Sequence, residues 1–114
     1  MAKLERELTG DFRGLLNLIE DGIKRGSVSA SLEDGSDMEE GDVQVAVRVF
    51  ERYSWLGSNR VSLSVTLVGK GDKLLLSAIT SGGSQAMFFK INTFGESAFL
   101  DKLVEIVDGY QGSR

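Results

Sequence analysis

Arginine and aromatic residues that can bind a ligand are concentrated in one stretch of this chain, from Arg48 to Arg60. The candidate ligand-binding residues there are Arg48, Arg52, Tyr53, Trp55 and Arg60. Guanidinium groups bind anions through paired hydrogen bonds, and they stack on aromatic rings and other flat groups. If Arg48 and Arg52 share the uncovered face of a sheet with Phe50, these side chains form one wall of a site for an anionic or flat small molecule. The alternative is that the arginines are scattered over the surface and the aromatic residues pack on their own turn.

Acidic residues are concentrated just before this stretch. Six acids lie within ten residues: Glu33, Asp34, Asp37, Glu39, Glu40 and Asp42. Closely spaced carboxylates suit Ca²⁺ or Mg²⁺, but their spacing does not match an EF-hand loop. We therefore interpret the segment Glu33–Gly41 as a mobile, solvated loop without a metal site, whose charges discourage aggregation at a sheet edge.

A glycine-rich segment, Gly82-Gly83-Ser84-Gln85, offers backbone N–H groups that can bind a phosphate. It lacks the P-loop pattern and the lysine that such a loop requires. We interpret it as a turn between strands.

Histidine and cysteine are both absent. The chain therefore has no imidazole base, no thiol nucleophile and neither of the two commonest transition-metal ligands. Paired carboxylates, tyrosine and lysine are the remaining catalytic candidates, and no pair of them stands out. We predict a protein that is not an enzyme and that uses no cofactor.

Length and charge place the chain among ordinary globular domains. It has 114 residues, of which 41% are hydrophobic and 26% are charged, and its net charge is −4. Without the six clustered acids, the remaining eleven acidic residues are outnumbered by thirteen basic ones, and this balance does not suggest nucleic-acid binding. No apolar run approaches the ~20 residues of a membrane helix. We expect one cytoplasmic domain over residues 1–110, with a disordered tail at 111–114.

The most regular pattern is a hairpin over residues 59–80. Apolar and polar residues alternate in its first arm, which is typical of a half-buried strand. We expect a four-residue turn, Gly69-Lys70-Gly71-Asp72, which pairs Val68 with Lys73. The apolar pairs that this register predicts are Leu67 with Leu74, Val65 with Leu76, and Leu63 with Ala78.

The other elements follow from similar patterns. Residues 2–8 fit either a helix or a strand, and the break at Thr9-Gly10-Asp11 favours a strand. A helix is predicted over Asp11–Arg25, with Asp11 as its N-cap. Strands are predicted over Ser27–Leu32, Asp42–Arg52 and Ala86–Ile91. A closing helix over Phe94–Asp108 would begin at a capping box formed by Thr93 and Glu96.

These elements predict an α+β fold: an antiparallel sheet of four to six strands, with an N-terminal-side helix and a C-terminal helix packed on one face. We expect the core to contain the valines and leucines of the strands, including Val45, Val47, Leu63, Val65 and Leu76. The order of elements resembles helix-grip and TATA-binding-protein-like folds in topology.

The sequence of residues 57–96, GSNRVSLSVTLVGKGDKLLLSAITSGGSQAMFFKINTFGE, together with GSVSASLE at residues 26–33, resembles a small bacterial family known as a domain of unknown function. This resemblance covers nearly the whole chain. It implies no catalytic residue, substrate or partner.

Our functional hypothesis is a non-enzymatic binding or interaction module. A homodimer is expected to form through the second face of the sheet, which would carry small residues with an apolar fringe. The small residues are Ser29, Ser31, Ala46, Ser62, Ser64, Thr66 and Ser77, and the fringe is Phe50, Val68, Leu75 and Ile79. The alternative is a small-molecule or lipid carrier with a cavity between the helices and the sheet; a copurifying apolar ligand would favour it.

Overall fold

The structure is a computed structural model that describes residues 3–26, 30–54, 59–82 and 89–110; the side chains of residues 53–54, 59 and 89–98 fall outside this description. The elements are β1 (Lys3–Thr9), α1 (Phe12–Gly26), β2 (Ser31–Glu40), β3 (Val43–Ser54), β4 (Asn59–Lys70), β5 (Lys73–Gly82) and α2 (Phe89–Tyr110). The expected tail at 111–114 and the expected turn at 83–85 lie outside the described residues.

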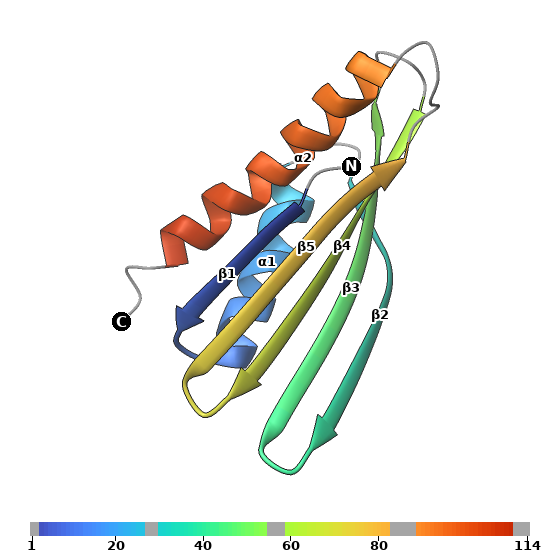
Figure 1. Ribbon diagram of the computed structural model, residues 1–114. Helices are drawn as coiled ribbons and strands as arrows, with labels where there is room; N and C mark the ends of the chain where they lie inside the picture. The colour runs from blue at the N-terminus through green and yellow to red at the C-terminus, as the bar shows by residue number, and fades with distance from the viewer. Residues whose placement is uncertain (1–2, 27–29, 55–58, 83–88, 111–114) are drawn as a thin grey trace.

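The five strands form one antiparallel sheet in the order β1-β5-β4-β3-β2. Both helices lie on the same side of it (Figure 1). The α+β fold and the two-helix layer are therefore as predicted. The strand at the N-terminus is also confirmed, and it closes one edge of the sheet by pairing with β5.

Helix α1 forms where its sequence predicts it. The Asp11 carboxylate accepts a hydrogen bond of 2.7 Å from the backbone N–H of Gly14, so Asp11 is the N-cap. One stripe of the helix is buried, namely Phe12, Leu15, Leu16, Ile19 and Ile23. Gly22 allows α2 to approach closely, because a Cβ at this position would lie 2.5 Å from the Ile106 side chain.

Helix α2 is longer than predicted. It begins at Phe89, so the strand expected over Ala86–Ile91 is wrong for its described residues, and Thr93 and Glu96 lie inside the helix rather than at its cap. A short apolar run such as this one does not by itself distinguish a strand from a helix. The far end of α2 is fixed to α1: the Tyr110 hydroxyl accepts a hydrogen bond of 2.6 Å from the backbone N–H of Asp11. Arg6 of β1 also forms an ion pair of 3.0 Å with Asp108.

The hairpin β4–β5 has a tighter turn than expected. Lys70 pairs with Lys73, so the turn contains only Gly71 and Asp72, and Val68 pairs with Leu75 instead of Lys73. The predicted register is wrong by two residues. Gly71 has φ 62°, and a glycine with positive φ at the first position of a two-residue turn matches the twist of a hairpin. A shift of two residues keeps every side chain on the same face of the sheet, so the predicted burial of this hairpin is correct although the register is not.

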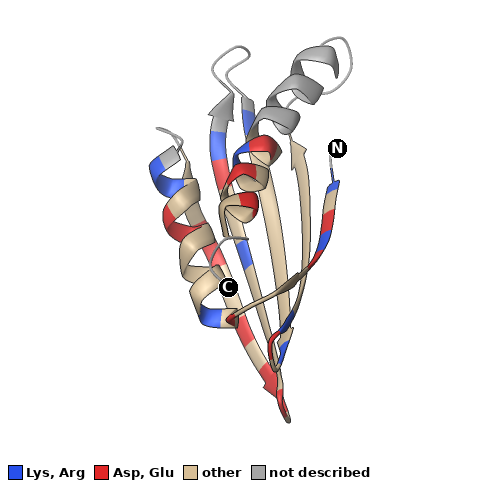
Figure 2. Cartoon of the chain, turned by 90° about the vertical axis from the view of Figure 1, so that its left-hand side faces the viewer, with Lys and Arg blue, Asp and Glu red and all other residues tan. Residues whose placement is uncertain are grey.

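The acidic segment is a strand and not a loop. Residues Ser31–Glu40 form β2, which pairs with β3 along its length, and the expected loop over Glu33–Gly41 is wrong. Only Gly41 and Asp42 remain in the turn, and Gly41 has φ 61°. The low strand propensity of the acids is overridden because β3 supplies backbone partners and an edge strand can leave its side chains in water. The turn end of this hairpin extends beyond the helices and is strongly acidic (Figure 2).

Burial shows which side of each strand faces the helices. In β4 and β5 the predicted side is correct, since Leu63, Val65 and Leu76 are buried. In β3 it is reversed: Ala46, Arg48 and Phe50 are buried against the helices, whereas Val45 and Val47 are half-buried on the other side. The side of the sheet away from the helices is called the open face below.

Candidate functional site

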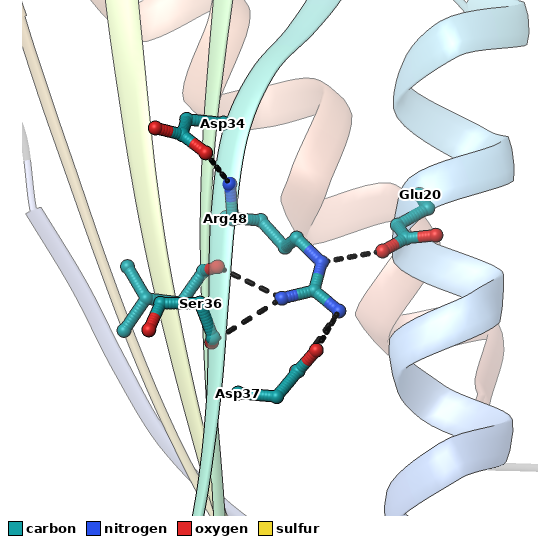
Figure 3. A network of polar contacts seen from close by, with 7 residues as sticks. Glu20, Asp34, Ser36, Asp37 and Arg48 are labelled. Carbon is teal, nitrogen blue, oxygen red and sulfur yellow. Dashed lines mark hydrogen bonds and ion pairs between the residues drawn. The ribbon is translucent and has the colours of Figure 1, made fainter.

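Arg48 lies in the helix-facing layer and not on the open face, and it is only 7% exposed. The guanidinium Nε lies 2.5 Å from Glu20 of α1, and Nη2 lies 3.0 Å from Asp37 of β2 (Figure 3). Nη1 donates to the backbone carbonyls of Val47, at 2.9 Å, and Ser36, at 3.4 Å.

This network satisfies the buried charge. Burial by itself lowers the pKa of Arg48, but the hydrogen bonds and charges of Glu20 and Asp37 outweigh it, so its pKa is raised and the group stays charged. Gly35 makes room for the side chain, because a Cβ there would lie 2.9 Å from Arg48 Cδ. Arg48 thus joins the edge strand β2 to α1, and these bonds occupy the guanidinium that the sequence suggested for a ligand.

The other candidate ligand residues do not gather around Arg48. Arg52 also faces the helices, where its guanidinium lies 4.8 Å from the centre of the Phe99 ring and burial lowers its pKa. Arg60 is exposed and forms ion pairs with Glu51 and, at 3.8 Å, with Glu33. The Tyr53 side chain and all of Trp55 lie outside the described residues. The arginine wall expected on the uncovered face is therefore wrong, because Arg48 and Arg52 lie on the helix-facing side of β3.

The open face is the surface with the clearest capacity to bind. Its centre is formed by three positions on each of β3, β4 and β5, and none of them is charged. These positions are Val45, Val47, Val49, Ser64, Thr66, Val68, Leu75, Ser77 and Ile79. Three large side chains of the open face are well exposed: the exposed fraction is 57% for Met38 of β2, 52% for Leu75 and 41% for Ile79.

Charged residues surround this centre. Lys3, Glu5 and Glu7 of β1 lie along one edge, and Asp34 of β2 lies on the other. Glu40, Lys70 and Lys73 close one end, and Glu51 lies at the other. An uncharged centre within a charged rim is the usual anatomy of a protein–protein interface. Val68, Leu75 and Ile79 lie on this face as expected. Ala46 and Phe50 were also expected here but face the helices, and the valines of β3 lie on this face instead.

The open face is also hollowed on the β1 side. One hollow of about 550 Å³ is lined by residues that include Leu75, Lys70 and Lys73. A second of about 480 Å³ adjoins it, and the two share Glu7, Val68 and Leu75. Within the part of the chain that the structure describes, no group of three or more acidic side chains is placed to hold a metal ion.

The fold and this surface define a class of protein: a small α+β domain with one helix-covered face and one open, partly apolar face. The chain belongs to the Family of unknown function (DUF6054), whose model matches residues 1–111. No curated protein matches the chain. Among solved structures it is similar to the crystal structure of TTHA0849 from Thermus thermophilus, at 12% identity and a TM-score of 0.40, over 97% of this chain and 99% of that one. None of the described helices has the length and apolar character needed to span a membrane.

Proposed function

We propose that this protein is a non-enzymatic interaction module that binds a protein partner through its open face. The observation that carries the proposal is the uncharged centre, in which Leu75 and Ile79 are exposed, with Met38 exposed beside it on β2. Exposed large apolar side chains on one contiguous face indicate a contact surface, because burying them removes apolar area from water. An antiparallel sheet whose open face serves only as a solvated surface usually alternates to polar residues there, and β3 presents valines instead.

The small-molecule carrier is less favoured. It needs space between the helices and the sheet, and there the side chains of Leu15, Ile19 and Leu63 have no exposed surface. The two hollows described above lie on the opposite side of the sheet. A cytoplasmic location in a bacterial cell is part of this proposal, and fractionation of cells that express the tagged chain tests it.

The test of the proposal is a comparison of two arginine substitutions. Ser64→Arg places a long charged side chain in the centre of the open face, and Leu18→Arg places the same side chain at an exposed position of α1. Tagged chains are cross-linked in cells and isolated, and the masses of the products are measured. We expect species heavier than the tagged monomer, which is the 12.4 kDa chain plus its tag, for the unmodified chain and for Leu18→Arg, and their loss for Ser64→Arg. Heavier species that persist in a Ser64→Arg protein with an unchanged circular dichroism spectrum would contradict the proposal.

A further inference from the structure

One row of paired residues crosses the open face and has a protrusion at one end and a hollow at the other. From β2 to β1 the row is Met38, Val45, Val68, Leu75 and Glu7. Met38 lies on the edge strand β2 and is the most exposed of the large apolar side chains among the described residues. Glu7 lies on the opposite edge strand β1 and Leu75 lies next to it on β5, and both line the two hollows. The protrusion and the hollow are thus at the same height along the strands.

We propose that the partner of the open face is a second copy of this chain, related by a two-fold axis that runs parallel to the strands above β4. This inference rests on the proposed function, whose binding surface it uses. Because β4 is the central strand, such an axis lays β2 of one copy on β1 of the other and keeps each row at its own height. Met38 of each copy then enters the hollow of the other. A two-fold interface requires this reciprocity, since each contact occurs twice, once from each copy.

The charged rim supports this axis. Asp34 and Lys3 occupy the two ends of one row, so the axis brings Asp34 of one copy to Lys3 of the other. Glu40 ends another row, and the axis brings it to Thr9 of the second copy, which is uncharged. Glu5 meets Ser36, which is also uncharged. Opposite charges thus face each other at one position of each edge, and complementary rims of this kind fix the register of an interface.

The other two-fold axis within the plane of the face, perpendicular to the strands, is disfavoured. It lays β1 on β1 and β2 on β2 and reverses the order of rows, so Met38 of one copy meets Asp34 of the other instead of the hollow. Glu5 then meets Glu5, although Lys3 meets Glu7. Like charges placed directly opposite destabilise an interface.

The size of the face suits a stable dimer. Five strands at a spacing of ~4.8 Å and strands of ten residues at ~3.3 Å each give a face of about 24 by 33 Å. That is about 800 Å² per copy, which matches the area that each partner contributes to an interface of standard size.

The first test exchanges the rim charges. Within one chain Lys3 and Asp34 lie four strand spacings apart, about 19 Å, so they cannot form an ion pair with each other. We expect the purified protein to be a dimer in light scattering at micromolar concentration. Lys3→Glu alone and Asp34→Lys alone should each weaken the dimer about tenfold, since each creates a like-charge contact twice. The double variant should restore the dissociation constant to about the unmodified value, and failure to do so would overturn the proposed arrangement.

The second test identifies the axis by cross-linking. The chain contains no cysteine, so an introduced pair is the sole source of reactive thiols. In Met38→Cys/Glu7→Cys the two thiols of one chain are about 19 Å apart, whereas sheets packed face to face lie ~10 Å apart, so a thiol-specific cross-linker with a spacer of about 10 Å joins the two positions only between copies. We expect a covalent dimer on a denaturing gel after this treatment of the double variant. A covalent dimer from Glu5→Cys alone would instead indicate the perpendicular axis and overturn the proposal.

The failure of this inference is distinguishable from failure of the proposed function. If the purified protein is a monomer of 12.4 kDa at micromolar concentration, the second copy is not the partner. The open face can then still be the binding surface for a different protein. That question is decided separately by the cross-linked species from cells and their dependence on Ser64→Arg.

Discussion

The two long hairpins of the sheet, β2–β3 and β4–β5, have the same turn and opposite chemistry. Each turn is a Gly-Asp pair with its glycine at positive φ, 61° at Gly41 and 62° at Gly71. In β4–β5 the helix-facing side is an apolar layer with one buried threonine, Thr80, and the open side mixes serine and threonine with a few apolar residues. In β2–β3 the valines are on the open side, and Arg48 is buried beneath the helices.

This difference shows that hydrophobicity alone does not decide which side of a strand faces a core. Valine is the most frequent apolar residue in β3, yet Val45 and Val47 are half-buried, because the pairing with β4 fixes which residues face the helices. Phe50 lies beside Leu63 and Arg48 beside Val65 on that side. The buried arginine is tolerated since Glu20 and Asp37 both reach it. One hairpin is thus held to the helices by apolar packing, and the other by the apolar side chains of Ala46 and Phe50 together with a charged network.

The largest expected effect on stability comes from the apolar layer of β4–β5, and it is compared with the effect of a valine in β3. Leu63→Ala should lower the free energy of unfolding by roughly 2–5 kcal/mol, because Leu63 is fully buried and its removal leaves a cavity. Val47→Ala should cost less than about 1 kcal/mol, because the side chain is half-buried on the open face. Urea denaturation of both variants in the Ser64→Arg background, where association does not contribute, gives the two values. Equal losses would contradict the assignment of the two sides of β3, because Val47 would then be as buried as Leu63.

The next largest effect on stability is expected when the Glu20 charge, which joins α1 to Arg48 of β3, is removed. Glu20→Ala should cost about 1.5–3 kcal/mol, the usual contribution of a hydrogen bond to a charged group, because Arg48 is buried and keeps only Asp37 as a charged partner. Asp21→Ala is the matched control on the same helix. Its exposed pair with Arg25, at 3.8 Å, should contribute no more than about 1 kcal/mol.

The pH dependence of this effect has a definite sign. The pKa of Arg48 is raised in the folded state, so its stabilisation is complete below the ordinary arginine pKa and is lost only as the pH rises through the higher, folded value. The difference between Glu20→Ala and the unmodified protein should therefore stay constant between about pH 7 and pH 9. A loss of stability for Asp21→Ala as large as that for Glu20→Ala would show that the network has no special role.

The smallest effect concerns the acidic end of the β2–β3 hairpin. Millimolar Ca²⁺ or Mg²⁺ should leave the melting temperature unchanged to within about 1 °C, because a ligand stabilises a protein only if it binds the folded state preferentially. The acids along β2 are divided between the two sides of the strand, with Asp37 and Glu39 on the helix-facing side and Asp34 and Glu40 on the open face, so they do not converge on one point. Differential scanning fluorimetry with and without EDTA measures this, and a rise of several degrees would contradict it.

Much of the fold was predictable because its signals are local. The alternation in β4, the apolar stripe of α1 and the Asp11 cap each lie within a few residues, and each predicted the right element. The register of β4–β5 was predicted incorrectly because a four-residue turn and a two-residue turn both preserve the alternation. The Arg48 network had a weaker signal, since Glu20 is 28 residues away in the sequence. Gly35 within an acidic segment gave no local indication that it makes room for an arginine.

The sequence by itself determined the class of fold, most of the elements and the apolar layer of β4 and β5. The regular spacing of apolar residues that predicts these features lies within short segments of the chain. Only the tertiary structure decided that the acidic segment is a strand, since the segment has low strand propensity and its backbone hydrogen bonds are made with β3. It also decided that Arg48 faces the helices and the valines of β3 face outward. The side of a strand is set by pairing across the sheet, and a sequence read one segment at a time does not contain that pairing.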